Sequence, residues 1–266
     1  MYPLRTATKA AAYRVVSALP YSAHARQVRA LRARTEALYR GFIQPGDLCF
    51  DIGANVGDRT AALAALGAHV IAVEPQDSCV RTLRRRFARQ SLVQVVPMAV
   101  GEQEGTADLA ICDAAPTLST LSRQMQTESR FAGTYAWTRT QRVSVTTLDA
   151  LIARYGRPAF CKIDVEGFEL SVLRGLSAPL NLLSFEFMRE LLHDTRACVD
   201  YLDSLGPTSF NYACGESHVL AQETWCDEAA LFEALGRDTM PDLWGDIYAH
   251  ARSFPTALGN TVEAGT

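Results

Sequence analysis

The chain has 266 residues, of which 48% are hydrophobic and 21% charged, and its formal net charge is −3. These values are typical of a globular protein and exclude a disordered, collagen-like or coiled-coil chain. The near-neutral charge provides no general attraction to nucleic acid. The basic residues are 24 arginines and only two lysines, Lys9 and Lys162, so the position of each lysine is informative.

Seven cysteines are scattered along the chain without a Cys-x-x-Cys pair. An odd number at low density, with several in apolar runs, predicts reduced and buried thiols rather than disulfides or a zinc site. No run of 18 apolar residues is present, and no apolar stretch long enough for a signal peptide follows the N-terminus. We therefore expect a cytoplasmic protein with no integral membrane segment.

The N-terminal residues 1–43 are helical in pattern and basic, with Glu36 as their single acid. We interpret them as a helical extension that caps the main domain, although such a segment is also typical of a membrane-surface or anionic-substrate patch. Residues 44–254 are expected to form the main domain. Residues 255–266 are small and polar, which predicts a flexible tail.

Short apolar segments alternate with helical patterns in the first half of the main domain. Strands are predicted at 47–52, 69–73 and 92–98, and helices at 58–66 and 80–90. Each predicted strand is continuously apolar, which indicates burial on both faces. This arrangement predicts an α/β protein with a parallel sheet and helices on each side.

The second half begins with a polar stretch, 101–140, which we interpret as a substrate or lid loop containing one short strand at 107–111. Further strands are predicted at 159–165 and 182–187, with helices at 147–155, 168–175, 195–205 and 227–235. Residues 209–213 and 218–223 are interpreted as a terminal hairpin.

A glycine motif of the form D-x-G-x-N-x-G occupies residues 51–57, at the first strand–helix turn. Open α/β sheets bind ligands at this position, outside the carboxyl ends of their strands. Gly53 allows a tight turn, and Gly57 allows the helix to pack close to the strand. Glu74 ends the second strand, where a carboxylate can accept both hydroxyls of an adenosine ribose. The motif therefore predicts a nucleoside cofactor.

The motif also favours S-adenosyl-L-methionine over a dinucleotide cofactor. A dinucleotide site typically has a second glycine where Asn55 stands, and it surrounds a pyrophosphate with backbone N–H groups. Asp51 would repel a pyrophosphate and attract a cation, such as the amino group of a methionine moiety. S-adenosyl-L-methionine has that ammonium, a sulfonium and a ribose, and it has no phosphate.

Several segments then occur in a familiar order. They are FDIGANVG at 50–57, AVEP at 72–75, VTTLD at 145–149, KIDVEGFE at 162–169, LRG at 173–175 and SFE at 184–186. Together they resemble the FkbM family of S-adenosylmethionine-dependent methyltransferases, with KIDVEG as the most specific piece. The match runs from about residue 46 to 186, and WGDIY at 244–248 is similar to the family's C-terminal end.

The resemblance implies a class I methyltransferase, Rossmann-like fold: a seven-stranded, mostly parallel sheet with an antiparallel last hairpin and helices on both faces. It assigns residues 44–254 to a methyltransferase domain (EC 2.1.1.-) that methylates a hydroxyl of a sugar, glycan or natural product. It implies that the motif glycines cradle the methionine part, Glu74 the ribose, and the segment after strand three the adenine. The cofactor-binding residues it implies are Asp51, Gly53, Ala54, Asn55, Gly57, Glu74, Pro75, Gln76, Met98, Ala99 and Asp164.

The catalytic candidates follow two neighbouring strands. Lys162 and Asp164 have the same parity on a predicted strand, so they project to one face. Glu166 follows at the end of that strand, and Glu186 ends the next one. Because charged groups in an apolar strand are costly unless paired, Lys162 and Asp164 are either a structural ion pair or a catalytic one.

Methyl transfer to an alcohol needs a base that removes the hydroxyl proton. Asp164 or Glu166 is the first choice for this base, and His193, after the fifth strand, is the second. Asp164, Glu166, Glu186 and His193 have ligand types that suit Mg²⁺ or Mn²⁺. Their spacing does not favour a metal site, and we predict none.

Three other functions fit the sequence less well. A nicotinamide-dependent oxidoreductase on a Rossmann-type sheet is the main alternative, but Asn55 replaces its second glycine and no Tyr-x-x-x-Lys pair is present. A nucleic-acid amino-methyltransferase is disfavoured because acids at 164–167 would repel phosphates. A binding module without catalysis is disfavoured by the intact acids of the motifs.

Overall fold

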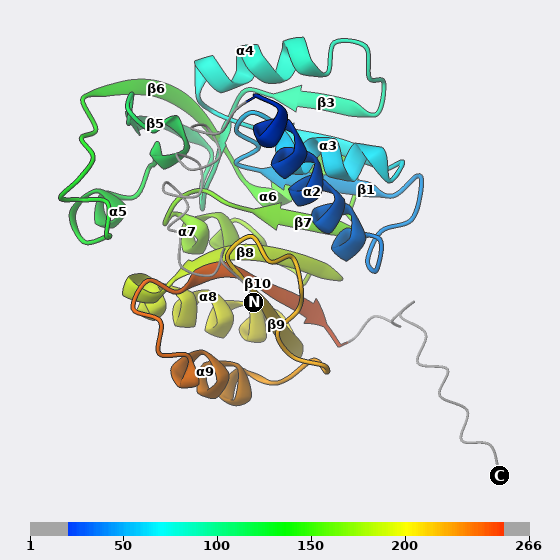
Figure 1. The fold of residues 1–266 in the computed structure, drawn as a ribbon, viewed down its shortest axis with the longest axis vertical. Coiled ribbons are helices and arrows are strands. Elements are labelled where there is room, and N and C mark those ends of the chain that lie inside the picture. The colour runs from blue at the N-terminus through cyan, green and yellow to red at the C-terminus, as the bar shows by residue number, and fades with distance from the viewer. Residues whose placement is uncertain (1–20, 253–266) are drawn as a thin grey trace.

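The computed structural model describes residues 21–252 of the chain and contains a seven-stranded sheet (Figure 1). Its strands, in spatial order, are β3 (Val93–Val96), β2 (His69–Val73), β1 (Leu48–Ile52), β7 (Phe160–Ile163), β8 (Leu182–Met188), β10 (Trp244–Ala251) and β9 (Thr208–Cys214). Strand β10 is antiparallel to both of its neighbours, and the other pairs are parallel. The predicted fold class is confirmed.

Helices cover both faces of this sheet. The helices within the described residues are α2 (Tyr21–Tyr39), α3 (Asp58–Ala65), α4 (Asp77–Arg86), α5 (Arg123–Thr127), α6 (Leu148–Tyr155), α7 (Glu169–Arg174), α8 (Leu192–Leu205) and α9 (Glu228–Arg237), with 3-10 turns η1 (Pro116–Leu118) and η2 (Arg189–Leu191); α5 lies beside β5 and β6 (Figure 1). Helix α2 confirms the helical character predicted for part of 1–43. The predictions for residues 1–20 and for the tail 255–266 lie outside the described residues.

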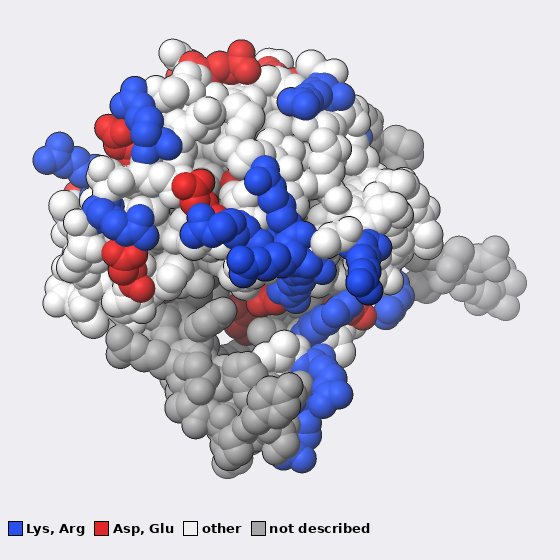
Figure 2. Space-filling view, turned by 90° about the horizontal axis from the view of Figure 1, so that it is seen from above, with Lys and Arg blue, Asp and Glu red and all other residues white. Residues whose placement is uncertain are grey.

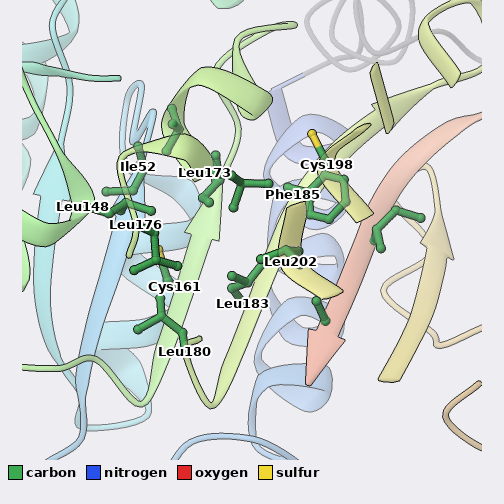
Figure 3. Close-up of a cluster of buried hydrophobic side chains, with 14 of the residues drawn as sticks. Ile52, Leu148, Cys161, Leu173, Leu176, Leu180, Leu183, Phe185, Cys198 and Leu202 are labelled. Atoms are coloured by element: carbon green, nitrogen blue, oxygen red, sulfur yellow. The ribbon is translucent and has the colours of Figure 1, made fainter. Parts of the chain in front are cut away.

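The side chains of β1 alternate between the two faces of the sheet. Cys49 belongs to a buried cluster that contains Tyr39 of α2 and Leu63 of α3. Phe50 and Ile52 belong to a second cluster, which includes side chains from α6, α7, α8 and α9 (Figure 3). Both faces of the sheet are therefore buried against helices, which is the reason its parallel strands are continuously apolar.

The cysteines lie mostly within these clusters. All seven are free thiols, and five of them are buried, as predicted.

Within residues 21–252, no helix is both long and apolar enough to cross a membrane.

The polar stretch 101–140 contains the short strand predicted at 107–111, and residues 112–138 are largely irregular, as expected of a loop. It contains β5 (Gly105–Ile111), η1 and α5, and it leads into β6 (Arg139–Thr146). Strand β6 pairs with β5 and with the short β4 (Ala99–Val100) in a separate three-stranded sheet. Sequence patterning missed β6 because only Val143 and Thr146 of its eight residues are buried.

The predicted pairing of residues 209–213 with residues 218–223 in a terminal hairpin is wrong. Strand β9 pairs with β10, not with residues 218–223, which lie in the segment between β9 and α9. His218, the first residue of the predicted second strand, has a positive φ angle, which breaks the extended backbone that a strand needs. Strand β10 is buried along its whole length because it lies between β8 and β9.

Gly245 provides a test of the β9–β10 pairing. A Cβ atom at this position would lie 2.0 Å from the backbone oxygen of Ala213. Gly245→Ala should therefore lower the free energy of unfolding by about 3 kcal/mol in chemical denaturation. Gly236→Ala is the matched control: a Cβ there meets no atom within 4 Å, and alanine favours the helix. Equal stability of the two variants would contradict the pairing.

Candidate active site

A cavity of about 610 Å³ lies at the carboxyl ends of β1, β2 and β7. Its lining includes most of the predicted cofactor residues. These are Gly53, Ala54, Asn55, Glu74, Pro75, Gln76, Met98, Ala99 and Asp164. Residues of α2 from Val28 to Thr35 also line it, so the N-terminal helix forms part of its wall.

The glycine loop brings the ends of β1 and β7 together. Gly53 has a φ of +77°, and a Cβ atom there would lie 1.8 Å from the backbone oxygen of Asp164. Asn55 is also left-handed, with a φ of 50°. At Gly57, a Cβ atom would meet the ring of Phe87 at 2.5 Å. Gly53 therefore fixes the cavity floor, and Gly57 fixes the packing of α3 against α4.

Glu74 presents a buried carboxylate to the cavity. Its Oε2 accepts the backbone N–H of Asn55 at 2.8 Å, and its Oε1 accepts that of Gln76 at 2.7 Å. Burial raises the pKa of Glu74 to about 7, although these two hydrogen bonds oppose the shift. A carboxylate has about four lone-pair sites, so each oxygen keeps capacity for one more donor, such as a ribose hydroxyl.

A row of three charged side chains crosses the ends of β1 and β7. Asp51 is the register neighbour of Lys162, and Nζ of Lys162 donates to Oδ2 of Asp164 at 2.6 Å. Thr60 also donates to Asp51 at 2.5 Å. Burial raises the pKa of Asp51, and the charge of Lys162 opposes that shift. Lys162 and Asp164 line the cavity, whereas the fully buried Asp51 is not part of its lining.

The loop after β7 is held in an unusual conformation. Glu166 and Gly167 both have positive φ angles, of 56° and 86°. Oε1 of Glu169 accepts the backbone N–H groups of Val165 at 3.0 Å and Gly167 at 3.3 Å. Thr120 Oγ1 donates to the carbonyl of Glu166 at 2.7 Å. The loop that carries the candidate base is therefore fixed from both sides.

Three predicted acids converge at this point. Carboxylate oxygens of Asp164, Glu166 and Glu186 lie within 4.8 Å of one another. Glu186 lines a second, smaller cavity of about 270 Å³ on the other side of the 166–168 loop. Within residues 21–252, this is the one group of acids with a spacing that suits a hard cation.

His193 does not join this group. Its side chain is 63% exposed, and its Nε2 lies 3.1 Å from Oδ1 of Asp194 and 2.9 Å from Nε2 of Gln124. It lines neither of the two cavities.

Sequence reasoning missed Arg59, a half-buried arginine of α3 that lines the main cavity. Its guanidinium donates to Glu216 at 2.8 Å and to Thr35 of α2 at 3.2 Å, and it lies 3.2 Å from Nε2 of His218. Burial alone would raise the pKa of Glu216, but Arg59 and His218 take it well below its usual range. The available signal was a cation in the first turn of a helix, where an anion is favoured.

Glu169 should make stability depend on pH. Burial raises its pKa from 4.5 to about 7. The folded protein therefore binds this proton more tightly than the unfolded chain, so the stabilisation is present below pH 4.5 and lost as pH rises through 7. Glu169→Gln keeps the acceptor oxygen without the charge. Its Tm relative to wild type should rise by several degrees between pH 5 and pH 8, measured by thermal unfolding.

Glu104→Gln, at an exposed position, is the control for removal of one carboxylate from the chain. A Glu169→Gln difference that is the same at pH 5 and pH 8 would contradict a raised pKa in the fold.

Comparison with known proteins identifies a family. The methyltransferase FkbM domain matches residues 51–198, which is more than half of the chain. The hexuronic acid methyltransferase AglP of Haloferax volcanii is 25% identical over 141 residues, covering 52% of this chain and 54% of the relative. The chain thus spans about half the length of this curated relative.

Solved structures show a weaker likeness. Precorrin-6y C5,15-methyltransferase from Geobacter metallireducens has 13% identity and a TM-score of 0.44, covering 83% of this chain and 87% of that chain. The N-terminal domain of EvdMO1 with SAH bound has 12% identity and a TM-score of 0.40, covering 84% and 81%. These values indicate nothing about substrate, and the assignment depends on the domain match. The chain belongs to the FkbM methyltransferase family.

Proposed function

We propose that residues 44–254 form an S-adenosyl-L-methionine-dependent methyltransferase that acts on a hydroxyl of a sugar, glycan or natural-product acceptor. The observation that carries this proposal is the buried Glu74 carboxylate at the wall of a cavity large enough for a nucleoside cofactor. Membership of a methyltransferase family supports methyl transfer over the hydride transfer of an oxidoreductase. The hexuronic acid methyltransferase among its relatives supports a sugar acceptor.

The donor set of the cavity fits this cofactor. Glu74 would hold the ribose hydroxyls, because both of its oxygens are already oriented by backbone N–H groups. Gln76, Met98 and Ala99 line the neighbouring wall, where the adenine would lie. Asp164 lines the cavity, whereas Asp51 does not. Because S-adenosyl-L-methionine has no phosphate, the site needs no cluster of backbone N–H groups to bind one.

When bound, S-adenosyl-L-methionine supplies an electrophilic methyl group on a cationic sulfur. The protein has to align the acceptor oxygen with that methyl group and remove the hydroxyl proton. Lys162 fixes the orientation of Asp164 through their 2.6 Å contact. Glu166 lies two residues on and lines the same cavity. We assign proton removal to this carboxylate pair, with Lys162 as the positioning residue.

Replacement of Glu74 should weaken cofactor binding. Glu74→Gln keeps the side-chain volume but removes the charged acceptor, so affinity for S-adenosylhomocysteine should fall tenfold or more in calorimetric titration. Wild-type affinity should also rise between pH 6 and pH 8 as Glu74 ionises, and the variant should lose this dependence. Asp77→Asn, an exposed neighbour, should bind within twofold of wild type. Unchanged binding by Glu74→Gln would remove Glu74 from the ribose site.

Replacement within the carboxylate pair should act on turnover. Asp164→Asn should lower kcat at least 100-fold while cofactor affinity falls less than tenfold, measured by transfer of labelled methyl groups to an acceptor found by screening sugars. Lys162→Arg should also slow turnover at least tenfold. Lys162 is only 2% exposed, so the space around its ammonium does not accommodate a larger, forked guanidinium. Full activity of both variants would place the proton acceptor elsewhere.

A further inference from the structure

Four exposed arginines stand at the mouth of the main cavity. Arg29, Arg32 and Arg34 come from α2, and Arg86 comes from the end of α4. All four line the cavity. The side chains of Arg32 and Arg86 are 45% and 34% exposed, whereas Glu74 deeper inside is 6% exposed. We call these four residues the arginine rim.

Backbone and side-chain contacts hold part of the rim in place. Arg32 donates to Glu36 at 2.7 Å and to the carbonyl of Ala61 at 3.3 Å. Arg86 donates to Asp58 at 2.6 Å and to the carbonyl of Val56 at 2.8 Å. Both guanidiniums are thereby fixed over α3 and the glycine loop. Glu36 and Asp58 are the acids in these two contacts.

The interior of the cavity has the opposite character. Glu74, Asp164 and Glu166 line it at depth, and Lys162 pairs with Asp164. Figure 2 shows Lys and Arg side chains gathered in the middle of one face, beside a hollow with acidic atoms at its edge. Charge is therefore separated along the cavity, with acids at the inner end and arginines at the outer end.

We infer that the arginine rim binds an anionic group of the acceptor, a carboxylate or a phosphate, while the acceptor hydroxyl points inward to Asp164 and Glu166. This inference rests on the proposed function. A guanidinium fork matches both anions in a bidentate geometry, and it keeps its charge at any working pH. The inner acids suit the cationic cofactor and would repel the acceptor's anion, so the charge separation sets the direction in which the acceptor enters.

The position of the rim distinguishes it from the general arginine content of the chain. Arg81, Arg84 and Arg85 are also exposed on α4, but they do not line the cavity. A purely solvated surface, or one facing a membrane, would not need guanidiniums directed into a cavity. The α4 arginines outside the cavity therefore provide a control with the same change in net charge.

The test measures binding to the full chain saturated with S-adenosylhomocysteine. The probes are methyl α-D-glucuronide for the carboxylate, glucose 1-phosphate for the phosphate, and methyl α-D-glucoside as the neutral sugar, titrated by ligand-observed NMR at low salt. Wild type should bind at least one anionic probe ten times more tightly than the neutral one. Arg29→Gln/Arg34→Gln should lose at least fivefold of that affinity, and Arg81→Gln/Arg84→Gln should retain it.

The two proposals fail separately. If wild type does not bind S-adenosylhomocysteine, the proposed function fails. If it does, but anionic and neutral probes bind equally, or both double variants lose equal affinity, the rim inference alone is overturned. A tenfold loss of S-adenosylhomocysteine affinity in Arg29→Gln/Arg34→Gln would place these arginines on the cofactor instead. Loss only of binding to phosphatidylglycerol vesicles would assign them to a membrane surface.

Discussion

The ion pair between Lys162 and Asp164, with Asp51 beside it, is the constraint on which the site depends. Asp51 and Lys162 are buried and Asp164 is half-buried at the adjoining ends of β1 and β7, where an unpaired charge would be strongly destabilising. Each charge is tolerable because the others are present. The strands must therefore keep their register, and Gly53 must let the backbone of Asp164 approach. The pairing of these charges therefore contributes both to the stability of the fold and to the geometry of the site.

The cavity beside these charged residues has acids at its inner end and arginines at its mouth. Glu74 gains its orientation from two backbone N–H groups, and Glu169 gives the same support to the loop that carries Glu166. Both glutamates have a pKa near 7 because burial disfavours their charge. Arginines from two helices then meet at the mouth. A cationic cofactor and an anionic acceptor would each find the charge that suits it.

Several residues of the proposed site could be placed from the sequence because they lie beside strand ends, where sequence spacing fixes position. This holds for Gly53, Glu74, Lys162 and Asp164. Arg59 and Glu216 could not be found in this way, since 157 residues separate them and only tertiary packing brings them together. Strand β6 was missed because its exposed face is polar. His193 was singled out by residue type alone, and its 63% exposure could not be inferred from sequence.

Equilibrium titration of the wild-type chain with S-adenosylhomocysteine and, separately, with NADH tests the central claim most directly. The carboxylate and glycine arrangement predicts one S-adenosylhomocysteine bound per chain with micromolar or tighter affinity, on the order of −8 kcal/mol, and no detectable NADH binding. Tight NADH binding without S-adenosylhomocysteine binding would contradict the account, because it would require a pyrophosphate to sit beside the buried acids of β1 and β7.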